Sequence, residues 1–138
     1  MRGSTGAAAA LFIAFLAGLP PPSAAGTPFS QDSAWAVLRH IAGEIGPRPM
    51  GSPAERRAME FALERFRAAG CDTAYVIPFT TAGGVNTASG IAVGMKKGRT
   101  GRIIVLGGHI DSAGPEIPGA NDDGSGTAVV LEAARVLA

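Results

Sequence analysis

The sequence predicts an α/β fold, because two helix patterns, a group of strand patterns and a final helix pattern follow one another along its 138 residues. The two amphipathic stretches carry helix start and stop signals. An unbroken apolar run at residues 103–106 follows, and a last helical pattern begins at Ser125. An apolar run without polar alternation is typical of a strand buried on both faces, as in the central sheets of α/β proteins.

The first helix is predicted to begin at Ser30 or Asp32, either of which can cap it. Gly46 followed by Pro47 is a typical stop signal, so the helix is expected to end at about residue 45. Residues at helical spacing should form one apolar face, namely Trp35, Leu38, Ile41 with Ala42, and Ile45.

The second helix has the clearest start signal in the chain. Ser52 is placed as N-cap, Pro53 occupies the first helical position, and Glu55 completes a capping box, while Gly70 ends the helix. The charged residues, Glu55 included, are expected to form a solvated face. The predicted buried stripe consists of Met59, Leu63 and Phe66, with Ala62 and Ala69 beside it.

Two short strands are predicted next, at residues 73–79 and around residues 91–93, with a loop over 80–86 between them. Pro78 cannot donate a ladder hydrogen bond, so it belongs at a strand end or sheet edge. The basic stretch 96–102 is expected to be a solvated turn between strands. Cys71 is expected to be a free, partly buried thiol.

Composition excludes several classes of protein. The formal net charge of +1 provides no basic surface of the kind that nucleic-acid binding requires, so no nucleic-acid partner is expected. A single cysteine excludes an intrachain disulfide framework and an all-cysteine zinc finger.

Residues 1–25 have the layout of a secretory signal peptide. Arg2 provides a positive start, an apolar run follows over 7–19, and small residues precede Gly26. The run is shorter than the roughly 20 residues of a membrane-spanning helix. We therefore expect a mature part at 26–138 that is secreted or periplasmic, without a stable membrane anchor after cleavage. An uncleaved anchor and a low-complexity alanine tract are the alternatives.

The apolar run leads directly into a group of polar residues that can support chemistry. His109 and Asp111 are two residues apart, so in an extended chain their side chains point the same way. Asp122 and Asp123 lie in a glycine-flanked turn that can fold back toward His109. All four follow the carboxyl end of the predicted central strand, which is where α/β sheets bind ligands.

Each of these two motifs alone has an ordinary structural explanation. Polar residues at strand ends are common, and the Asn-Asp-Asp-Gly-Ser-Gly stretch at 121–126 can be a helix-capping turn. Together they favour a metal site, because an imidazole and a carboxylate suit zinc and a cation neutralises adjacent acids. The second ring nitrogen of a metal-binding histidine is usually held by a carboxylate, which Asp111 can supply.

The motifs Gly-Gly-His-Ile-Asp-Ser at 107–112 and Pro-Gly-Ala-Asn-Asp-Asp-Gly-Ser-Gly at 118–126 resemble those of co-catalytic zinc exopeptidases related to aminopeptidase Y. That family also includes glutamate carboxypeptidase and glutaminyl cyclase. The turn at 45–53 is similar to the proline-rich turn that many members carry. The resemblance implies a partial three-layer α/β/α zinc-exopeptidase fold with a mixed central sheet, of which residues 26–138 form the N-terminal portion.

The resemblance also implies a role for each polar residue. His109 would bind one of two zinc ions, and Asp122 would bridge both. Asp111, counted with the catalytic residues, would orient His109, and Asp123 would support the site from behind. A cis peptide between Asp122 and Asp123 is implied as well.

Other parts of the family's site have no counterpart here. In the family the base is a Glu of a downstream Glu-Glu pair, and a further Asp and a final His complete the two metal shells. This sequence has only Glu132 as an acid after Asp123 and no His there. Glu132 is not assigned the base role, and His40 is expected to be a surface or helix-packing residue. We therefore expect the N-terminal part of a secreted, bacterial-type aminopeptidase that cleaves peptides through a metal-bridging water. A glutaminyl cyclase and a non-catalytic binding or structural member are the alternatives.

Overall fold

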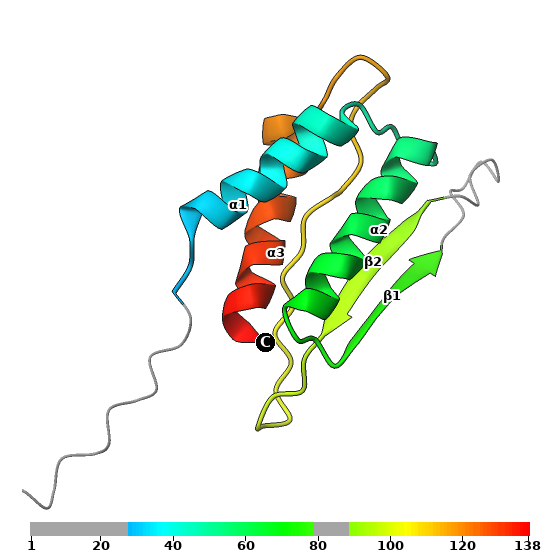
Figure 1. The fold of residues 1–138 in the computed structure, drawn as a ribbon. Helices are drawn as coiled ribbons and strands as arrows, with labels where there is room; N and C mark the ends of the chain where they lie inside the picture. Colours follow the sequence, from blue (N-terminus) through cyan, green and yellow to red (C-terminus); the bar gives the residue numbers. More distant parts are fainter. Residues whose placement is uncertain (1–27, 79–88) are drawn as a thin grey trace, which may run out of the picture.

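One helix packs on a two-stranded sheet and the other helices pack beside it in the computed structural model, which describes residues 28–78 and 89–138 (Figure 1). The elements follow the order α1 (Gln31–Leu38), η1 (Arg39–Ile45), α2 (Pro53–Ala68), β1 (Thr73–Pro78), β2 (Gly90–Met95), η2 (Ala120–Gly124) and α3 (Ser125–Leu137). The α/β class predicted from the sequence is confirmed. The predicted signal peptide at 1–25 and the loop at 80–86 lie outside the described residues.

The predicted helix signals are confirmed at both ends of the first two helices. The Ser30 hydroxyl accepts a hydrogen bond from the Ser33 amide at 3.2 Å, and α1 continues without interruption into the wider turns of η1. Gly46 ends η1 with a φ of 76°, a left-handed conformation that glycine adopts most easily. The Ser52 hydroxyl caps α2 by accepting from the Glu55 amide at 3.0 Å.

Two predictions about helix faces were wrong. Trp35 is 59% exposed, whereas Ile41 of the predicted face is buried, together with Val37. Trp35 lies outside the buried face because α1 packs along α3, and the core cluster contains Val37 and Ile41. Glu55 is buried rather than solvated, because Ser89 and the Gly51 amide both donate to its carboxylate.

The core lies between the helices and the inner face of the sheet. β1 and β2 pair antiparallel, from Thr73 opposite Met95 to Pro78 opposite Gly90, so Pro78 stands at a strand end as predicted. Gly94 lies so close to the Phe66 ring that a Cβ there would come within 2.4 Å of it, which explains how β2 packs tightly on α2. The buried cluster comprises Val37, Ile41, Ala62, Phe66, Ala128 and Leu131.

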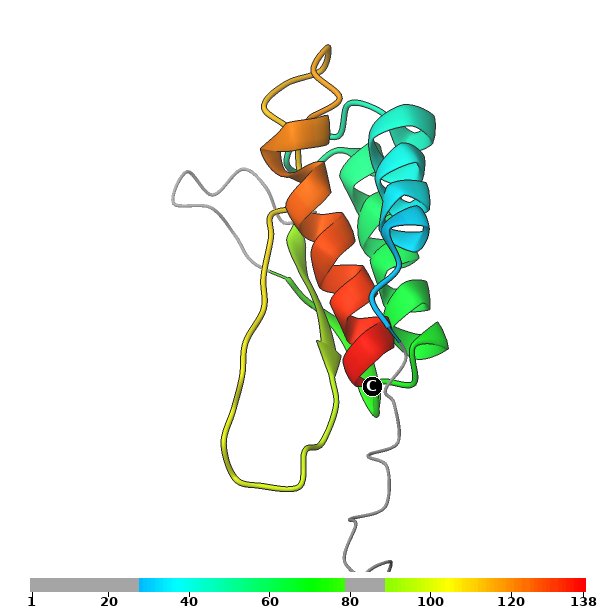
Figure 2. The same cartoon turned by 90° about the vertical axis from the view of Figure 1, so that its left-hand side faces the viewer.

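The predicted central strand at 103–106 was wrong for the described structure. These residues pair with no strand, and the exposed fractions of Ile103, Ile104 and Val105 are 87%, 86% and 83%. Figure 2 shows the stretch leaving the sheet as a wide loop after β2. The physical reason is that burial on both faces needs flanking strands and two covering layers. The described residues provide one helical layer and a two-stranded antiparallel sheet, rather than a three-layer arrangement with a mixed sheet.

The remaining smaller predictions agree with the structure in part. Residues 96–102 are exposed, as expected, but they do not connect two strands. Cys71 is a half-buried free thiol, and burial raises its pKa. Among the described residues, none of the helices has the length and apolar character needed to cross a membrane.

Candidate metal centre

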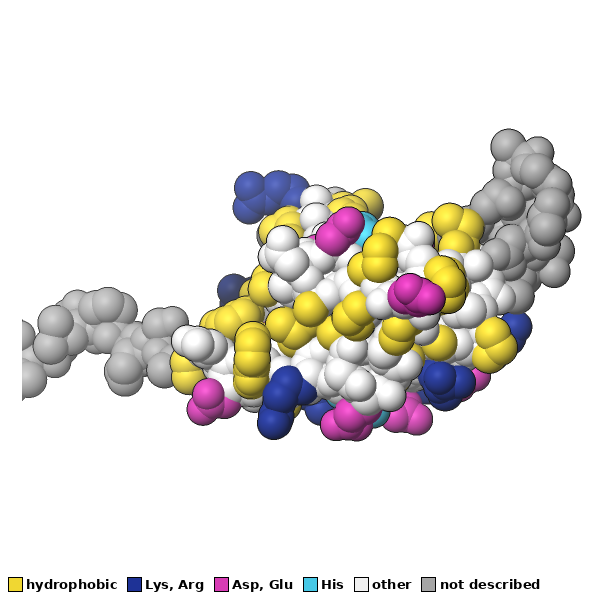
Figure 3. Space-filling view, turned by 90° about the horizontal axis from the view of Figure 1, so that it is seen from above, with side chains coloured by type: hydrophobic (Ala, Val, Ile, Leu, Met, Phe, Trp, Pro, Cys, Tyr) yellow, Lys and Arg dark blue, Asp and Glu magenta, His cyan; other side chains and the backbone are white. Residues whose placement is uncertain are grey.

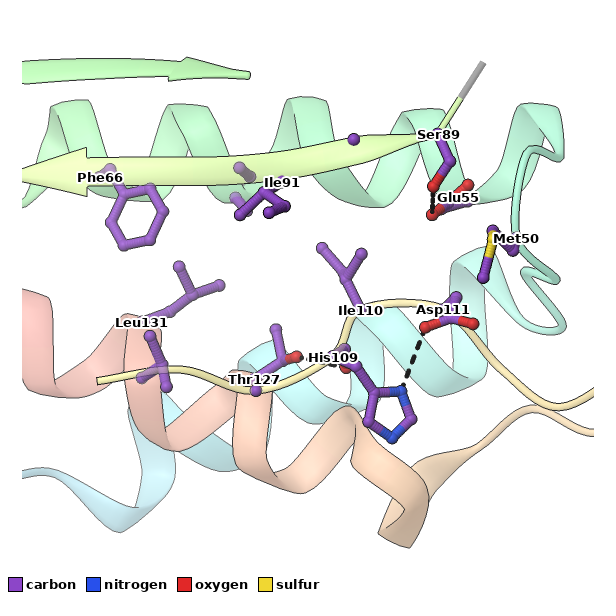
Figure 4. Close-up of a pocket in the computed structure, with 15 residues that line it drawn as sticks. Met50, Glu55, Phe66, Ser89, Ile91, His109, Ile110, Asp111, Thr127 and Leu131 are labelled. Atoms are coloured by element: carbon purple, nitrogen blue, oxygen red, sulfur yellow. Dashed lines mark hydrogen bonds and ion pairs between the residues drawn. The ribbon is translucent and has the colours of Figure 1, made fainter. Parts of the chain in front are cut away.

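The segment that carries His109 and Asp111 is extended, so its side chains alternate. Ile110 points toward Ile91 across a cavity of about 370 Å³, while the His109 ring lies on the other side of the segment (Figure 4). His109 Nδ1 lies 3.2 Å from Asp111 Oδ1. The sequence expectation that Asp111 orients this ring therefore has matching geometry in the structure.

The glycine-flanked turn brings Asp122 to the opposite side of the same ring. Asp122 Oδ1 lies 2.9 Å from His109 Nε2, and both side chains are open to solvent at 52% for His109 and 80% for Asp122. The peptide bond between Asp122 and Asp123 is cis, as the family resemblance implied. The two residues that the sequence proposed as metal ligands thus face each other.

Asp123 joins the histidine segment to the beginning of α3. Its carboxylate accepts from the His109 amide at 3.2 Å and from the Gly126 amide at 3.0 Å. Thr127 adds a hydrogen bond from its hydroxyl to the His109 carbonyl at 3.0 Å. A Cβ on Gly126 would lie 2.2 Å from the nearest Asp123 carboxylate oxygen, so only glycine allows this approach without a shift.

The charge state of His109 reflects its two acidic neighbours. Partial burial lowers the pKa of His109, but hydrogen bonds and negative charges from Asp122 and Asp111 together outweigh this effect and raise it above the ordinary value. The paired carboxylates thus create a local negative environment that favours a positive charge at this ring.

These residues fit one side of a zinc site. Two ligands bound to a tetrahedral zinc at about 2.0–2.1 Å are separated by about 3.3 Å, close to the 2.9 Å between His109 Nε2 and Asp122 Oδ1. An imidazole and a carboxylate are also suitable zinc donors. Within 28–78 and 89–138, however, no three His, Cys, Asp or Glu side chains are grouped closely enough to hold a metal ion. The described residues therefore supply two converging donors, His109 Nε2 and Asp122 Oδ1.

The other two residues considered in the sequence lie elsewhere. His40 Nδ1 bonds to Glu44 at 2.7 Å and its ring packs 4.3 Å from that of Phe61, which confirms a helix-packing role. Glu132 is buried in α3, where Arg135 and the Ser30 amide donate to its carboxylate. These hydrogen bonds join α3 to the beginning of α1.

Sequence reasoning missed Arg48, the largest fully buried side chain of the described residues. Its guanidinium donates to carbonyl oxygens on both sides of the loop that joins Asp111 to Asp122. Burial lowers the pKa of Arg48, and the negative charge of Asp111 opposes that change. The available signal was a charged residue held between Pro47 and Pro49, where a rigid turn fixes its direction.

The part of the chain that carries these residues is similar to known proteins. Residues 91–138 match the profile described as Peptidase family M28. Among similar proteins, leucine aminopeptidase 1 of Paracoccidioides brasiliensis (strain Pb03) is 56% identical over 45 residues, covering 29% of this chain and 12% of that protein. Leucine aminopeptidase 1 of Ajellomyces capsulatus (strain H88) is 54% identical over 46 residues, with the same coverage, and that of Grosmannia clavigera is 54% identical over 46 residues, with 29% and 11% covered. No solved structure matches the chain.

The motifs and the matches together support a metallopeptidase family assignment for this stretch of the chain. Over residues 91–138, the match to peptidase family M28 agrees with the co-catalytic zinc exopeptidase family that the motifs resemble. The matched stretch spans about an eighth of the length of these curated relatives.

Proposed function

We propose that this chain forms part of a secreted zinc aminopeptidase that removes N-terminal residues from peptides. The carrying observation is the convergence of His109 Nε2 and Asp122 Oδ1 at 2.9 Å, with His109 Nδ1 held 3.2 Å from Asp111. The family match at 91–138 and the names of the similar leucine aminopeptidases support the peptidase class.

In this proposal the chain's own residues have separate roles. His109 and Asp122 hold zinc, and Asp122, exposed at 80%, is accessible for bridging to a second ion. Asp111 fixes the tautomer and direction of the His109 ring, since its oxygen faces Nδ1. Asp123 holds the backbone amide of His109 against α3. Bound zinc would polarise the peptide carbonyl and lower the pKa of its water.

Zinc titration of the 138-residue chain by calorimetry tests the metal assignment. We expect His109→Ala and Asp122→Ala each to abolish measurable binding, and Asp111→Asn to weaken affinity by about 10–100-fold. His40→Ala is the matched control, because His40 also faces a carboxylate but lies away from the site. Unchanged zinc affinity after His109→Ala would refute the assignment.

A non-catalytic member of the fold is the second candidate. The observation in its favour is that only two donors, His109 and Asp122, converge in the described part of the chain. Hydrolysis of leucine anilide, measured with zinc present, separates the two candidates. Turnover that disappears in His109→Ala supports the peptidase, whereas zinc binding without turnover supports the non-catalytic member.

The proposed destination of the protein rests on the layout of residues 1–25, which is typical of a secretory signal. Expression with and without these residues, followed by fractionation, tests the proposal. We expect export and cleavage before Gly26 only when they are present.

A further inference from the structure

We propose that Arg48 is a positioning residue that sets the separation of His109 from Asp122, an inference that rests on the zinc site proposed above. Arg48 is fully buried, with an exposed fraction of 0%. All five of its side-chain hydrogen bonds within the described residues go to backbone carbonyl oxygens. A buried guanidinium whose side-chain hydrogen bonds go to backbone carbonyls restricts where those backbone segments can lie.

The Arg48 guanidinium contacts both ends of the loop that joins Asp111 to Asp122, called the site loop below. Arg48 Nε donates to the Ile110 carbonyl, which lies between the two residues of the His-x-Asp motif. Nη1 donates to the Pro118 carbonyl, and Nη2 donates to that of Gly119 at 3.1 Å, immediately before the turn that carries Asp122. One rigid planar group therefore spans the distance between the two halves of the proposed metal site.

The backbone of Arg48 adds a second attachment to the same loop. Its amide donates to the Ser112 hydroxyl at 2.9 Å, and its carbonyl accepts from the Ser112 amide at 3.1 Å. Ser112 is itself buried. Pro47 and Pro49 limit the backbone freedom of the turn, so the direction of the Arg48 side chain is fixed from its own side.

Two glycines near the turn that carries Asp122 lie where a side chain would have little space. Gly119 has a φ of 56°, and a Cβ there would lie 2.6 Å from the Asp122 carbonyl oxygen and 3.0 Å from Ser112 Cβ. A Cβ on Gly124 would lie 3.3 Å from Arg48 Nη2. The turn that carries the acids thus packs directly on the Arg48 guanidinium.

The test compares Arg48→Lys with Arg135→Lys in the full chain. Lysine keeps the charge but has one nitrogen, so it cannot reach Ile110 and Gly119 together. Arg135 is a matched control because it is also forked and joins distant segments, bonding Glu132 and the Pro28 carbonyl. Calorimetry measures the zinc affinity. Amide hydrogen exchange at Ser112 and Gly124, measured on the metal-free chain, shows how firmly the loop between Asp111 and Asp122 is held.

We expect Arg48→Lys to weaken zinc affinity by about 10–100-fold, as for other groups that hold metal ligands in place. Exchange at the Ser112 and Gly124 amides should accelerate at least about tenfold in the same variant. Arg135→Lys should change neither quantity. Equal effects from both variants, or none from Arg48→Lys, would overturn the positioning role.

Two further outcomes are decisive. If Arg48→Lys does not fold, Ser112→Ala replaces it, since this change removes only the hydroxyl that accepts from the Arg48 amide. Wild-type zinc affinity and exchange in Ser112→Ala would then overturn the inference. If the wild type binds no zinc, the proposed function fails, while the exchange rates still decide whether Arg48 fixes the loop.

Discussion

Arg48 and Glu132, two of the three buried charged side chains among the described residues, are stabilised in different ways. Arg48 is surrounded by neutral carbonyl oxygens from the site loop and from the end of η1. Glu132 lies against the opposite charge of Arg135 and accepts a hydrogen bond from the Ser30 amide at 2.7 Å, so it joins α3 to the beginning of α1. The first arrangement fixes loop geometry, whereas the second fixes how two helices pack. Buried charge therefore serves the candidate site in one region and the scaffold in the other.

The largest effect should come from removing the guanidinium altogether. We expect Arg48→Met to lower the free energy of unfolding by about 3–5 kcal/mol, because several buried carbonyls lose their donors. Urea unfolding measures the change. Arg56→Met, an exposed arginine on α2, should stay within about 0.5 kcal/mol. A loss below about 1 kcal/mol in Arg48→Met would show that water replaces the guanidinium at little cost.

The contact of Glu132 with Arg135 and the Ser30 amide should contribute less to stability than Arg48 does, and its contribution should depend on pH. We expect Glu132→Gln to cost about 1.5–3 kcal/mol at neutral pH, because its hydrogen bonds are charge-assisted. The hydrogen bond from Arg135 holds the pKa of Glu132 below its ordinary value. Its contribution is therefore present above the pKa of the unfolded chain and is lost as pH falls through the folded pKa.

Urea unfolding across the acid range checks this second prediction. The difference between wild type and Glu132→Gln should shrink as pH falls, whereas Glu64→Gln on the exposed face of α2 should match wild type throughout. A difference that stays constant with pH would contradict the ionic character of the contact.

A substitution at the beginning of α3, next to Asp123, should have a smaller effect on stability. Gly126→Ala places a Cβ against the Asp123 carboxylate, which is held by two backbone amides. We expect a loss of roughly 1–2 kcal/mol, since the carboxylate can turn aside only by giving up those bonds. Thermal unfolding measures it against Gly98→Ala, where the added Cβ meets open space. Equal stability of the two variants would argue against the Asp123 contact.

The smallest effect is expected in the exposed apolar run. Ile104 is 86% exposed, so Ile104→Thr should change the unfolding free energy by less than about 0.5 kcal/mol. Ile41→Thr, at a fully buried position, should cost several times more. Chemical denaturation of both variants makes the comparison. A large loss in Ile104→Thr would restore the sequence prediction of a buried strand.

Local signals in the sequence predicted local structure well. Ser52 at the cap of α2, Gly46 at the end of η1 and the helix beginning at Ser125 were all recognised, because each depends on neighbouring residues only. The family resemblance anticipated the cis bond between Asp122 and Asp123, which no periodicity predicts.

Properties that depend on distant partners were predicted poorly. The run at 103–106 carries an apolar pattern, but a pattern does not contain the strands that would flank it. Trp35 was placed on the wrong face because the position of α3 sets which side of α1 is covered. Arg48 was overlooked because its contacts with the loop depend on carbonyls more than sixty residues away, those of Ile110, Pro118 and Gly119.

The long-range bonds of Arg48 also have a consequence for the order in which the chain folds. Contacts between residue 48 and residues 110–119 close a segment of more than sixty residues, and closing so long a segment is entropically costly and slow. The proposed ligand pair should therefore reach its final spacing only after the helices have assembled. A peptide of residues 91–138 would contain the whole family match, yet it would lack the arginine that holds its own acidic turn in place.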